Sequence, residues 1–444
     1  MTLKSAIRKL VPERLILFYH FCLASLASLF YGYPSKKMVI IGVTGTKGKT
    51  SAANFIWSVL NTAGYKTGLL GTANIRIGKE EFLNKYHMTM PGRFILQKIL
   101  RKMVRAGCKF CVLEVTSEGI KQSRHIGISF DAAVFTNLYP EHLQAHGGSF
   151  LEYKKAKGKL FSTLSESKDF KMVGSKKAPK IIVVNNDSPD KNYFLSFRAD
   201  KKITFGLNDG ANFKAQEIQS NERGVNFLVR GTKYHLDILG EFNVLNALPA
   251  IALASNLGIP ANLIKQGLAN LKSIPGRMEK INEGQDFTVL VDYAHEKQSI
   301  TAVLDTAQNM VRENLGKVII LLGAEGGGRD KSKRPVMGKI SAQKADYVVV
   351  SNVDPYEDDP EEILEDIAKS SEKYGKIRGK DLFVIEDRRK GIRKALALAA
   401  KGDIVLITGK GAEQSIIIDG KYSAWDDRLV VKEELKNIVN RKSH

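Results

Sequence analysis

The sequence predicts an α/β protein made of two consecutive α/β domains, the first with a mostly parallel sheet and an added antiparallel subsheet. Three observations lead to this prediction. Short Val- and Ile-rich runs alternate with amphipathic helical patterns from Met38 onward. A turn-rich stretch with period-two alternation lies between residues 201 and 239 and is typical of antiparallel strands. The 444 residues, at roughly 150 residues per domain, leave room for two or three separate cores.

The first domain is expected over residues 38–274. Short apolar runs that end in glycine or in polar clusters predict strands at 38–45, 66–72, 109–117, 131–138 and 180–187. Helical periodicity closed by glycine predicts helices at 49–64, 94–107 and 243–258, and a further helix is expected at 260–272. Strands that alternate with helices in this way favour a mostly parallel sheet.

The second domain is expected over residues 275–444, after a linker at 273–281. Apolar runs predict strands at 287–294, 317–324, 345–353, 381–387 and 403–409. Helical segments separate these runs, so a Rossmann-like α/β domain is expected.

The composition limits the kinds of partner. A net charge of +21 favours anionic partners, such as nucleotides, phosphorylated substrates or an acidic membrane surface. Nucleic acid is not expected as a partner, because the sequence contains no recognised nucleic-acid module. The three cysteines are too few for a disulfide framework and indicate a reducing, cytoplasmic compartment. Cys108 and Cys111 form a C-x-x-C within an apolar run, which favours strand core over redox or metal chemistry.

Residues 1–37 are expected to form a short N-terminal helical segment. Its apolar part, Leu15 to Tyr33, contains no Lys, Arg, Asp or Glu and follows several basic residues. Nineteen helical residues would span roughly 28 Å, which is close to a bilayer core. The His and Ser content favours a helix that packs on the protein or contacts the inner membrane surface peripherally over one that crosses the bilayer.

The stretch Ile40 to Phe55 predicts a phosphate-binding loop. Glycines stand at 42, 45 and 48, and Lys49 and Thr50 follow at the start of a helix. This differs from the common P-loop spacing by one residue, but the physical elements are present. Backbone amides at the helix start can bind phosphate, Lys49 can neutralise its charge, and the Thr50 hydroxyl can bind Mg²⁺. The loop therefore predicts an ATP site; the alternative is an ordinary glycine turn before a helix.

Six further motifs follow in order. They are "LEVTSEGIKQSRHIGISFDAAVFTNLYPEHLQAHGGSFLEYKKAKGKLF", "LGEFNVLNALPAI", "PGRMEKI", "VDYAHEKQSI", "GAEGGGRDKSKRPVMG" and "ITGKGAEQS". Together with the loop, they resemble the Mur ligases over about residues 38–430, and most of all the branch that adds the third amino acid to UDP-N-acetylmuramoyl-dipeptide. The resemblance implies a cytoplasmic, monomeric, ATP- and Mg²⁺-dependent amide-bond ligase of cell-wall synthesis that acts through an acyl phosphate.

The resemblance also implies roles for individual residues. ATP binding is implied for Gly45, Thr46, Lys47, Gly48, Lys49, Thr50, Asn243, Arg277, Asp292, His295 and Arg329. Metal binding is implied for Thr50, Glu114, His142 and a carbamylated Lys157. Catalysis is implied for Lys49, Glu114, His142 and Lys157. Substrate binding is implied for Thr89, Thr116, Gln122, Arg124, Asp354, Tyr356, Gly409 and Glu413. The simpler alternatives are a surface histidine for His142, a solvated helix face for Lys157 and a helix N-cap for Asn243.

The sequence departs from the family pattern in several places. Only 37 residues precede the loop, where third-amino-acid enzymes carry a uridine-binding domain. Folylpolyglutamate synthetases and a subunit that amidates lipid-linked peptidoglycan precursor also have a short segment before the loop. A folate-like or lipid-linked acceptor is therefore the alternative to a UDP-linked one. A non-catalytic scaffold subunit is a further alternative, which the intact set of catalytic residues disfavours.

The amino-acid motif also differs. Diaminopimelate-adding enzymes have D-N-P followed by Arg, whereas this sequence places Tyr356 in "VDPYEDDP". Loss of the guanidinium removes bidentate capture of a distal carboxylate, so another amine such as lysine becomes a candidate. Asp354 and Glu413 are candidates to hold an ammonium group; the alternative for both is ordinary loop capping and surface charge. The charges of Glu118 and Glu296, where the family has other residues, have no explanation in the sequence.

Overall fold

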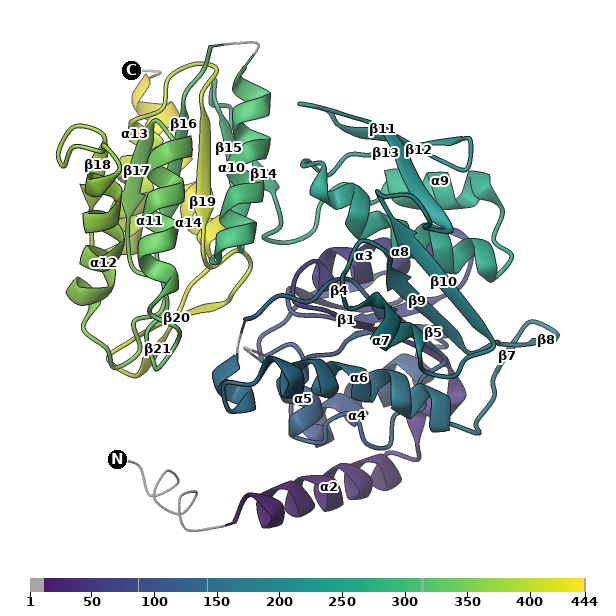
Figure 1. Ribbon diagram of the computed structural model, residues 1–444. Coiled ribbons are helices and arrows are strands. Elements are labelled where there is room, and N and C mark those ends of the chain that lie inside the picture. Colours follow the sequence, from purple (N-terminus) through teal and green to yellow (C-terminus); the bar gives the residue numbers. More distant parts are fainter. Residues whose placement is uncertain (1–11, 87, 142, 313–314, 443–444) are drawn as a thin grey trace. The chain divides into compact units, whose positions relative to one another are not determined.

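The computed structural model describes residues 12–86, 88–141, 143–312 and 315–442 (Figure 1). The chain divides into two compact units. Unit 1 comprises Met1–Glu217, Phe227–Tyr234 and Val244–Leu271, and unit 2 comprises Ile218–Asn226, His235–Asn243 and Lys272–His444.

The main elements of the first part of the chain form one large sheet and the helices around it. They are α2 (Glu13–Phe30), η1 (Pro34–Lys37), β1 (Val39–Thr44), α3 (Lys49–Thr62), β2 (Thr67–Leu70), β3 (Asn74–Ile77), β4 (Glu80–Leu83), α4 (Arg93–Arg105), β5 (Phe110–Glu114), α5 (Ser117–Lys121), β6 (Ala132–Phe135), η2 (Leu143–His146), α6 (Phe150–Glu166), β7 (Met172–Val173), β8 (Lys176–Lys177), β9 (Ile181–Asn185), α7 (Lys191–Leu195), β10 (Lys201–Gly206), β11 (Phe213–Asn221), β12 (Gly224–Val229), β13 (Thr232–Leu236), α8 (Phe242–Asn256) and α9 (Ala261–Asn270).

The rest of the chain forms a second α/β layer structure. Its elements are β14 (Glu279–Ile281), β15 (Thr288–Asp292), α10 (Lys297–Val311), β16 (Val318–Leu322), α11 (Lys333–Lys344), β17 (Tyr347–Val350), α12 (Pro360–Lys373), β18 (Leu382–Val384), α13 (Arg388–Ala397), β19 (Ile404–Thr408), β20 (Ser415–Ile418), β21 (Lys421–Ala424) and α14 (Asp427–Lys442).

The large sheet has the strand order β13-β12-β11-β10-β9-β6-β1-β5-β2-β3-β4 within the described residues. The strands from β2 to β10 in this order pair in parallel, whereas β2, β3 and β4 pair antiparallel. The central strand β1 has β5 on one side and β6 on the other. The strands of this sheet that follow β1 in the chain are placed first on its β5 side and then, from β6 onward, on its other side. Such a switch point opens a crevice at the carboxyl ends of the strands.

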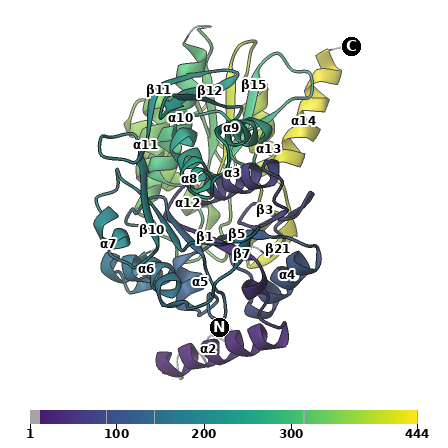
Figure 2. The same ribbon diagram turned by 90° about the vertical axis from the view of Figure 1, so that its right-hand side faces the viewer.

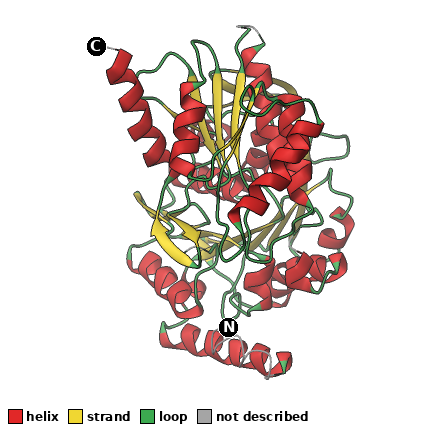
Figure 3. Ribbon diagram, turned by 90° about the vertical axis from the view of Figure 1, so that its left-hand side faces the viewer, coloured by secondary structure: helices red, strands yellow, loops and turns green. Residues whose placement is uncertain are grey.

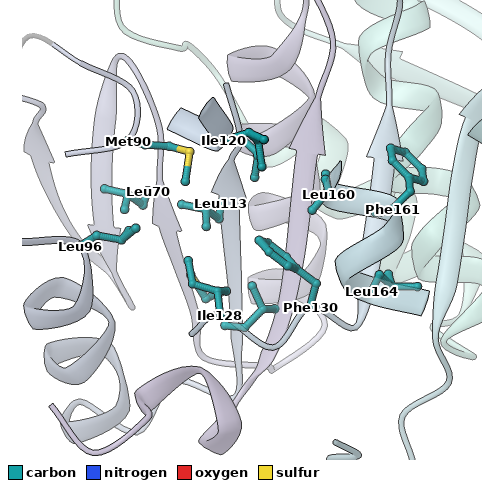
Figure 4. Packing of buried hydrophobic residues seen from close by; sticks show 14 of the residues in the cluster. Leu70, Met90, Leu96, Leu113, Ile120, Ile128, Phe130, Leu160, Phe161 and Leu164 are labelled. Carbon is teal, nitrogen blue, oxygen red and sulfur yellow. The ribbon is translucent and has the colours of Figure 1, made fainter. Parts of the chain in front are cut away.

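One face of this sheet packs on α4, α5 and α6. Apolar side chains from the strands, such as Leu113 of β5, meet Leu96 of α4, Ile120 of α5 and Leu160 of α6 (Figure 4). Cys108 and Cys111 belong to the same core, and both thiols are free. Burial raises the pKa of each thiol. Core packing of the C-x-x-C is therefore confirmed, with Cys111 in β5 and Cys108 buried just before this strand.

The C-terminal sheet has the order β14-β15-β19-β16-β17-β18 and is parallel except for β14, which runs antiparallel to β15. Alternate strand residues face opposite sides, as the pleat of a strand requires. Leu290 and Ile320 pack with α10, α11 and α12, and Val291 and Ile319 pack with α13 and α14. Figure 3 shows the strands of this sheet between helices. The Rossmann-like expectation is confirmed.

The prediction of an antiparallel subsheet over residues 201–239 is partly wrong. The strand β10, at the start of the 201–239 stretch, runs parallel to β9. Alternation of polar and apolar residues indicates a half-exposed strand. It does not indicate whether that strand runs parallel or antiparallel to its neighbour, because both kinds of strand share the same pleat. The antiparallel strands β3 and β4, at the opposite edge, were not predicted.

The apolar N-terminal segment forms α2, as expected for a helix. Among the described residues, no helix is both long and apolar enough to cross a membrane.

Candidate active site

The phosphate-binding loop connects β1 to α3, and two of its glycines are required by close approach. Gly48 caps α3 with a φ of 77°, and a Cβ there would lie 2.1 Å from Oδ1 of Asn246. Gly45 has a φ of 149°, and a Cβ there would lie 1.9 Å from Oγ1 of Thr136. Any larger residue would have to displace these neighbours and adopt an unfavourable backbone conformation.

The residues after β6 hold the loop in place. The amide of Thr46 donates to the carbonyl of Asn137 (2.9 Å), and the amide of Lys47 donates to Oδ1 of the same asparagine (2.8 Å). The Thr136 hydroxyl donates to the carbonyl of Lys47 at 2.7 Å. Asn137 therefore takes up two amides of the loop, and the loop is fixed before any ligand binds. Its position after a strand end was the signal that could have identified Asn137 from the sequence.

Two lysines meet at this loop. Nζ of Lys49 donates to the carbonyls of Gly45 and Thr46, both at 2.9 Å. Nζ of Lys157, on α6, donates to the same Gly45 carbonyl at 2.8 Å and lies 4.5 Å from the ring centroid of Tyr153. The Lys157 side chain is buried, so the interpretation of this residue as part of a solvated helix face is wrong.

The surroundings of Lys157 favour its neutral form. Burial lowers its pKa well below the ordinary value of a lysine, and the charge of Lys49 lowers the pKa further, while Glu141 opposes them. A neutral amine is the nucleophilic form of lysine. Lys157 is therefore suited to a covalent modification that a protonated surface lysine would resist.

Glu114 ends β5 and is fully buried. Its Oε2 accepts hydrogen bonds from the hydroxyls of Thr50 (3.1 Å) and Thr72 (3.0 Å), and its Oε1 accepts one from the Thr72 amide (2.8 Å). A carboxylate and two hydroxyls gathered at the carboxyl ends of parallel strands are oxygen ligands of the kind that Mg²⁺ prefers. These residues fit a magnesium ion. Thr72 was missed in the sequence, although it follows the strand β2.

The third residue of the expected metal set, His142, lies outside the described residues. Across the described ranges, no cluster of three or more His, Cys, Asp or Glu side chains is arranged to bind a metal. The structure thus brings Thr50 together with Glu114, and Lys49 together with Lys157 at the carbonyl of Gly45.

The residues expected to bind the muramoyl peptide lie around the 88–93 segment. The hydroxyl of Thr89 is 2.8 Å from that of Thr72. Arg124 donates from Nη1 to the carbonyl of Met90 and from Nη2 to Oε1 of Gln122, the latter at 2.7 Å. Thr116 differs in role, since its hydroxyl accepts from the Gly119 amide (3.1 Å) and caps α5.

A second arginine, Arg93, lies beside this group and was missed. Its Nη2 donates to the carbonyl of Gln122 at 2.7 Å. Burial lowers the pKa of Arg124, and the charge of Arg93 lowers it further, while Glu118 raises it. The charge of Glu118 therefore partly offsets the effects of burial and of Arg93 on the Arg124 guanidinium. An arginine at the start of a helix, where the helix dipole disfavours a cation, was the available signal for Arg93.

The nucleotide-binding residues expected in the later motifs belong to unit 2. Oxygens of Asp292 accept from the amides of Met278 (2.8 Å) and Ala294 (2.7 Å), so this carboxylate orders the end of β15. His295 is held by a 2.7 Å contact between its Nδ1 and the carbonyl of Tyr293. Arg277 lies with its Cζ 4.4 Å from the Tyr293 ring centroid.

Asn243 lies inside the first turn of α8 and is not its N-cap. Its side-chain amide donates to the carbonyl of Leu239 at 2.7 Å, and the residue is buried. The N-cap alternative is therefore wrong.

The residues expected to bind the amino acid meet at the carboxyl ends of β17 and β19. Nζ of Lys410 lies 2.7 Å from Oδ2 of Asp354 and 2.7 Å from Oε2 of Glu413. Oε1 of Glu413 accepts from the hydroxyl of Tyr293 at 3.2 Å. The two carboxylates hold the side-chain ammonium of Lys410, and the expectation that they bind an ammonium group of the substrate stays a prediction. Lys410 was missed in the sequence. Its position between the two glycines of "GKG" was the available signal.

The charges of this cluster are tightly coupled. Burial alone would lower the pKa of Lys410, but Glu413 and Asp354 outweigh it, and the net shift is upward. Burial raises the pKa of both Asp354 and Glu413, and Lys410 opposes the rise. Loss of the Lys410 proton would leave two buried carboxylates without their cation, which is unfavourable.

Tyr356 and Arg329 lie beside this cluster. The guanidinium carbon of Arg329 is 5.6 Å from the Tyr356 ring centroid, and its Nε is 3.5 Å from Oε2 of Glu325. Burial raises the pKa of Tyr356 to about 12. Gly409 has a φ of 111°, and a Cβ there would lie 2.8 Å from Cγ2 of Val353, so only glycine fits at this turn.

Comparison with known proteins identifies the family. The profile of the Mur ligase middle domain matches residues 43–254, and that of the Mur ligase glutamate ligase domain matches residues 276–411. The UDP-N-acetylmuramoyl-L-alanyl-D-glutamate–2,6-diaminopimelate ligase of Geobacillus kaustophilus is 36% identical over 431 residues, which cover 96% of this chain and 84% of the relative. The UDP-N-acetylmuramyl-tripeptide synthetase of a Roseiflexus species is 37% identical over 424 residues, with coverage of 94% and 82%.

Solved structures agree. A UDP-N-acetylmuramoyl-L-alanyl-D-glutamate–2,6-diaminopimelate ligase structure has a TM-score of 0.61 and 28% identity, and the match covers 92% of this chain and 79% of that one. The Mycobacterium tuberculosis folylpolyglutamate synthase complexed with ADP has a TM-score of 0.68 at 19% identity, with coverage of 88% and 92%, and shows the shared fold alone. The chain belongs to the Mur ligase family, whose members are ATP-dependent ligases that form amide bonds.

Proposed function

We propose that this protein adds an amino acid to UDP-N-acetylmuramoyl-dipeptide, a cytoplasmic precursor of peptidoglycan, through an acyl phosphate. The relatives at 36% and 37% identity, which carry this activity in their names, support the substrate. The observation that carries the chemistry is the pair of lysines at the carbonyl of Gly45, beside a buried Glu114. In this proposal residues 38–274 bind ATP and precursor, and residues 275–444 bind the amino acid.

The loop residues have separate roles in the proposed reaction. The substrate carboxylate attacks the γ-phosphate, and this transfer depends mainly on positioning and charge neutralisation. Lys49 exchanges its carbonyl partners in the loop for phosphate oxygens when ATP binds. Thr50, Glu114 and, by resemblance, His142 would hold magnesium, which supplies charge neutralisation at the phosphates.

Lys157 is proposed to be carbamylated. Its neutral amine forms a bond to the carbon of CO₂ and releases one proton to solvent, which leaves a carbamate anion. Carbamylation replaces an amine that competes with Lys49 for the Gly45 carbonyl by an anion that attracts the Lys49 ammonium group. Burial and the low pKa of Lys157 support the proposal, since only the neutral amine reacts.

The amino acid is proposed to be bound by Asp354, Glu413 and Lys410 together. Lys410 offers the cation that a carboxylate needs, and Glu413 Oε1, which accepts from the Tyr293 hydroxyl at 3.2 Å, can accept a further hydrogen bond from an amine. Diaminopimelate is the first candidate because relatives are named for it. Tyr356 replaces the arginine of such enzymes, and Arg329 is the cation beside its ring. Lysine is therefore the second candidate.

A substrate assay tests this proposal. Phosphate release from ATP is measured with UDP-N-acetylmuramoyl-dipeptide, lipid-linked precursor or dihydropteroate, each with diaminopimelate, lysine or glutamate. We expect turnover only with the UDP-linked dipeptide. The lipid-linked precursor is the second candidate acceptor, favoured by the exposed apolar side chains of α2. Turnover restricted to lipid-linked precursor or to dihydropteroate would overturn the proposed acceptor.

A further inference from the structure

The helix α2 presents large apolar side chains to solvent. Their spacing of three, four and seven positions places them on one side of the helix, here called the outer stripe. Each is between 53% and 72% exposed, and a continuous row of large exposed apolar side chains is uncommon on a monomeric soluble protein. The outer stripe consists of Leu15, Phe18, Tyr19, Leu26, Leu29 and Phe30.

The opposite side of α2 attaches it to unit 1. Small residues, Ala24, Ala27 and Ser28, are buried there. The Ser28 hydroxyl donates to the carbonyl of Gly127 at 3.1 Å, and a Cβ on Gly127 would lie 2.5 Å from Cβ of Ser28. Small residues allow close approach, and the large side chains must therefore point away. Figures 1 and 2 show α2 outside the layer of α4, α5 and α6, on the side away from the sheet.

Positive charge flanks the outer stripe. Helix α4 packs against α2, and the rings of Phe30 and Phe94 lie 6.2 Å apart. The sequence of α4 contains five basic residues and no acidic one. Three of them, Lys98, Lys102 and Arg105, are exposed. The 15–35 segment itself carries no Asp, Glu, Lys or Arg, and Lys36 and Lys37 follow it at the surface.

We propose that the outer stripe and the basic side of α4 form a docking surface for an anionic lipid bilayer. Apolar and aromatic side chains would enter the headgroup boundary while the lysines and arginines meet anionic headgroups. Tyrosine is common at this depth because its ring is apolar and its hydroxyl is polar. Helix α2 lies on the bilayer and does not cross it, which agrees with the absence of a membrane-spanning helix among the described residues.

The charges argue against a second copy of the chain as the occupant. Helices that pair in water through an apolar stripe usually carry charges of both signs along its flanks. A second copy would instead bring another uniformly basic α4 with its α2. Lipid binding does not depend on the proposed ligase function, because neither ATP nor the precursor takes part in it.

Vesicle flotation tests the proposal. The full-length protein is mixed with vesicles of phosphatidylcholine alone or with phosphatidylglycerol at a 7:3 ratio, an experimental choice on the order of bacterial anionic lipid content. We expect binding to the mixed vesicles, weakened by high salt. Phe18→Gln, Leu26→Gln and Phe30→Gln together should reduce binding at least about tenfold. The exchange of Lys98, Lys102 and Arg105 to Glu should do the same.

Matched variants control for general effects of polarity and charge. Leu315, Ile377 and Leu429 are also exposed, elsewhere in the chain, and their exchange to Gln should leave binding unchanged. Exchange of the exposed Lys265, Lys369 and Lys432 to Glu matches the change in net charge. Light scattering measures the oligomeric state in parallel. A dimer that the outer-stripe variant dissociates, without vesicle binding, would overturn the proposal in favour of self-association. Absence of both vesicle binding and dimer would also overturn it.

Discussion

Lys49 and Lys157 donate hydrogen bonds to the same backbone oxygen, the carbonyl of Gly45, at 2.9 Å and 2.8 Å. Two ammonium groups that share one neutral acceptor repel each other, and the more buried one has the larger cost of desolvation. Lys157 is the more buried, so it is the lysine whose pKa is lowered. Burial and the neighbouring charge of Lys49 therefore favour the neutral amine at Lys157.

Exchange of Lys157 for alanine should reduce ATP-dependent ligation at least about 100-fold, because the proposed carbamate oxygens would be lost. A short carboxylic acid such as acetate or propionate should restore part of the rate by supplying a carboxylate in the same space. The exposed Lys159, two positions along the same helix, provides the control as Lys159→Ala. Unchanged turnover in the Lys157 variant would exclude the carbamate.

Replacement of Thr50 by valine should raise the magnesium concentration needed for half-maximal turnover by about tenfold, since one oxygen ligand is removed while the side-chain volume is kept. Thr50→Ser retains the hydroxyl and should behave like the unaltered protein. A magnesium titration of initial rates measures both variants. If serine and valine give the same magnesium dependence, the hydroxyl of Thr50 does not contribute to the metal site.

Lys410→Met should destabilise unit 2 by about 3–5 kcal/mol at pH 8, because two buried carboxylates lose their cation. The pKa values of Asp354 and Glu413 are already raised by burial and should rise further. A carboxyl group whose pKa is higher in the folded than in the unfolded state binds more protons when the chain is folded. The free energy of unfolding therefore falls as the pH rises above the pKa of the unfolded state. The variant should therefore recover stability as the pH is lowered from 8 to 5.

Tryptophan fluorescence can measure this effect in unit 2 alone. The chain has two tryptophans, and a Trp57→Phe background leaves Trp425 as the reporter. Urea unfolding at pH 8 and pH 5 gives the two free energies. Lys401→Met, at an exposed position, is the control. A loss of stability that is equal at both pH values would contradict coupling between Lys410 and the two acids.

Tyr356→Arg should increase the preference for diaminopimelate over lysine at least about tenfold in kcat/KM, because a guanidinium can bind the distal carboxylate in two hydrogen bonds. Tyr356→Phe keeps the ring beside Arg329 and should leave the preference unchanged. Competition between the two amino acids in one reaction, followed by mass measurement of the product, gives the ratio. No change with arginine would place recognition of the distal group elsewhere.

Local patterns allowed much of this site to be predicted. The strand β1, the loop and the start of α3 are contiguous, so apolar periodicity followed by glycines and Lys49 is sufficient to predict them. Glu114 was predictable at the end of an apolar run. Thr72, Arg93 and Asn137 were missed because each is an ordinary polar residue until its neighbours are known.

The sequence alone determined the α/β class, the position of the loop and the family motifs, because these depend on residues close together in the chain. Tertiary structure decided which residues meet. Lys157 reaches Gly45 from 112 positions away, and Lys410 reaches Asp354 from 56 positions away. The apolar composition of α2 was visible in the sequence, but only packing showed that its small residues face the protein and its large ones face solvent. Burial and hydrogen bonding are properties of the folded chain, and they assign the charge state of Lys157 and the partner of Asp354.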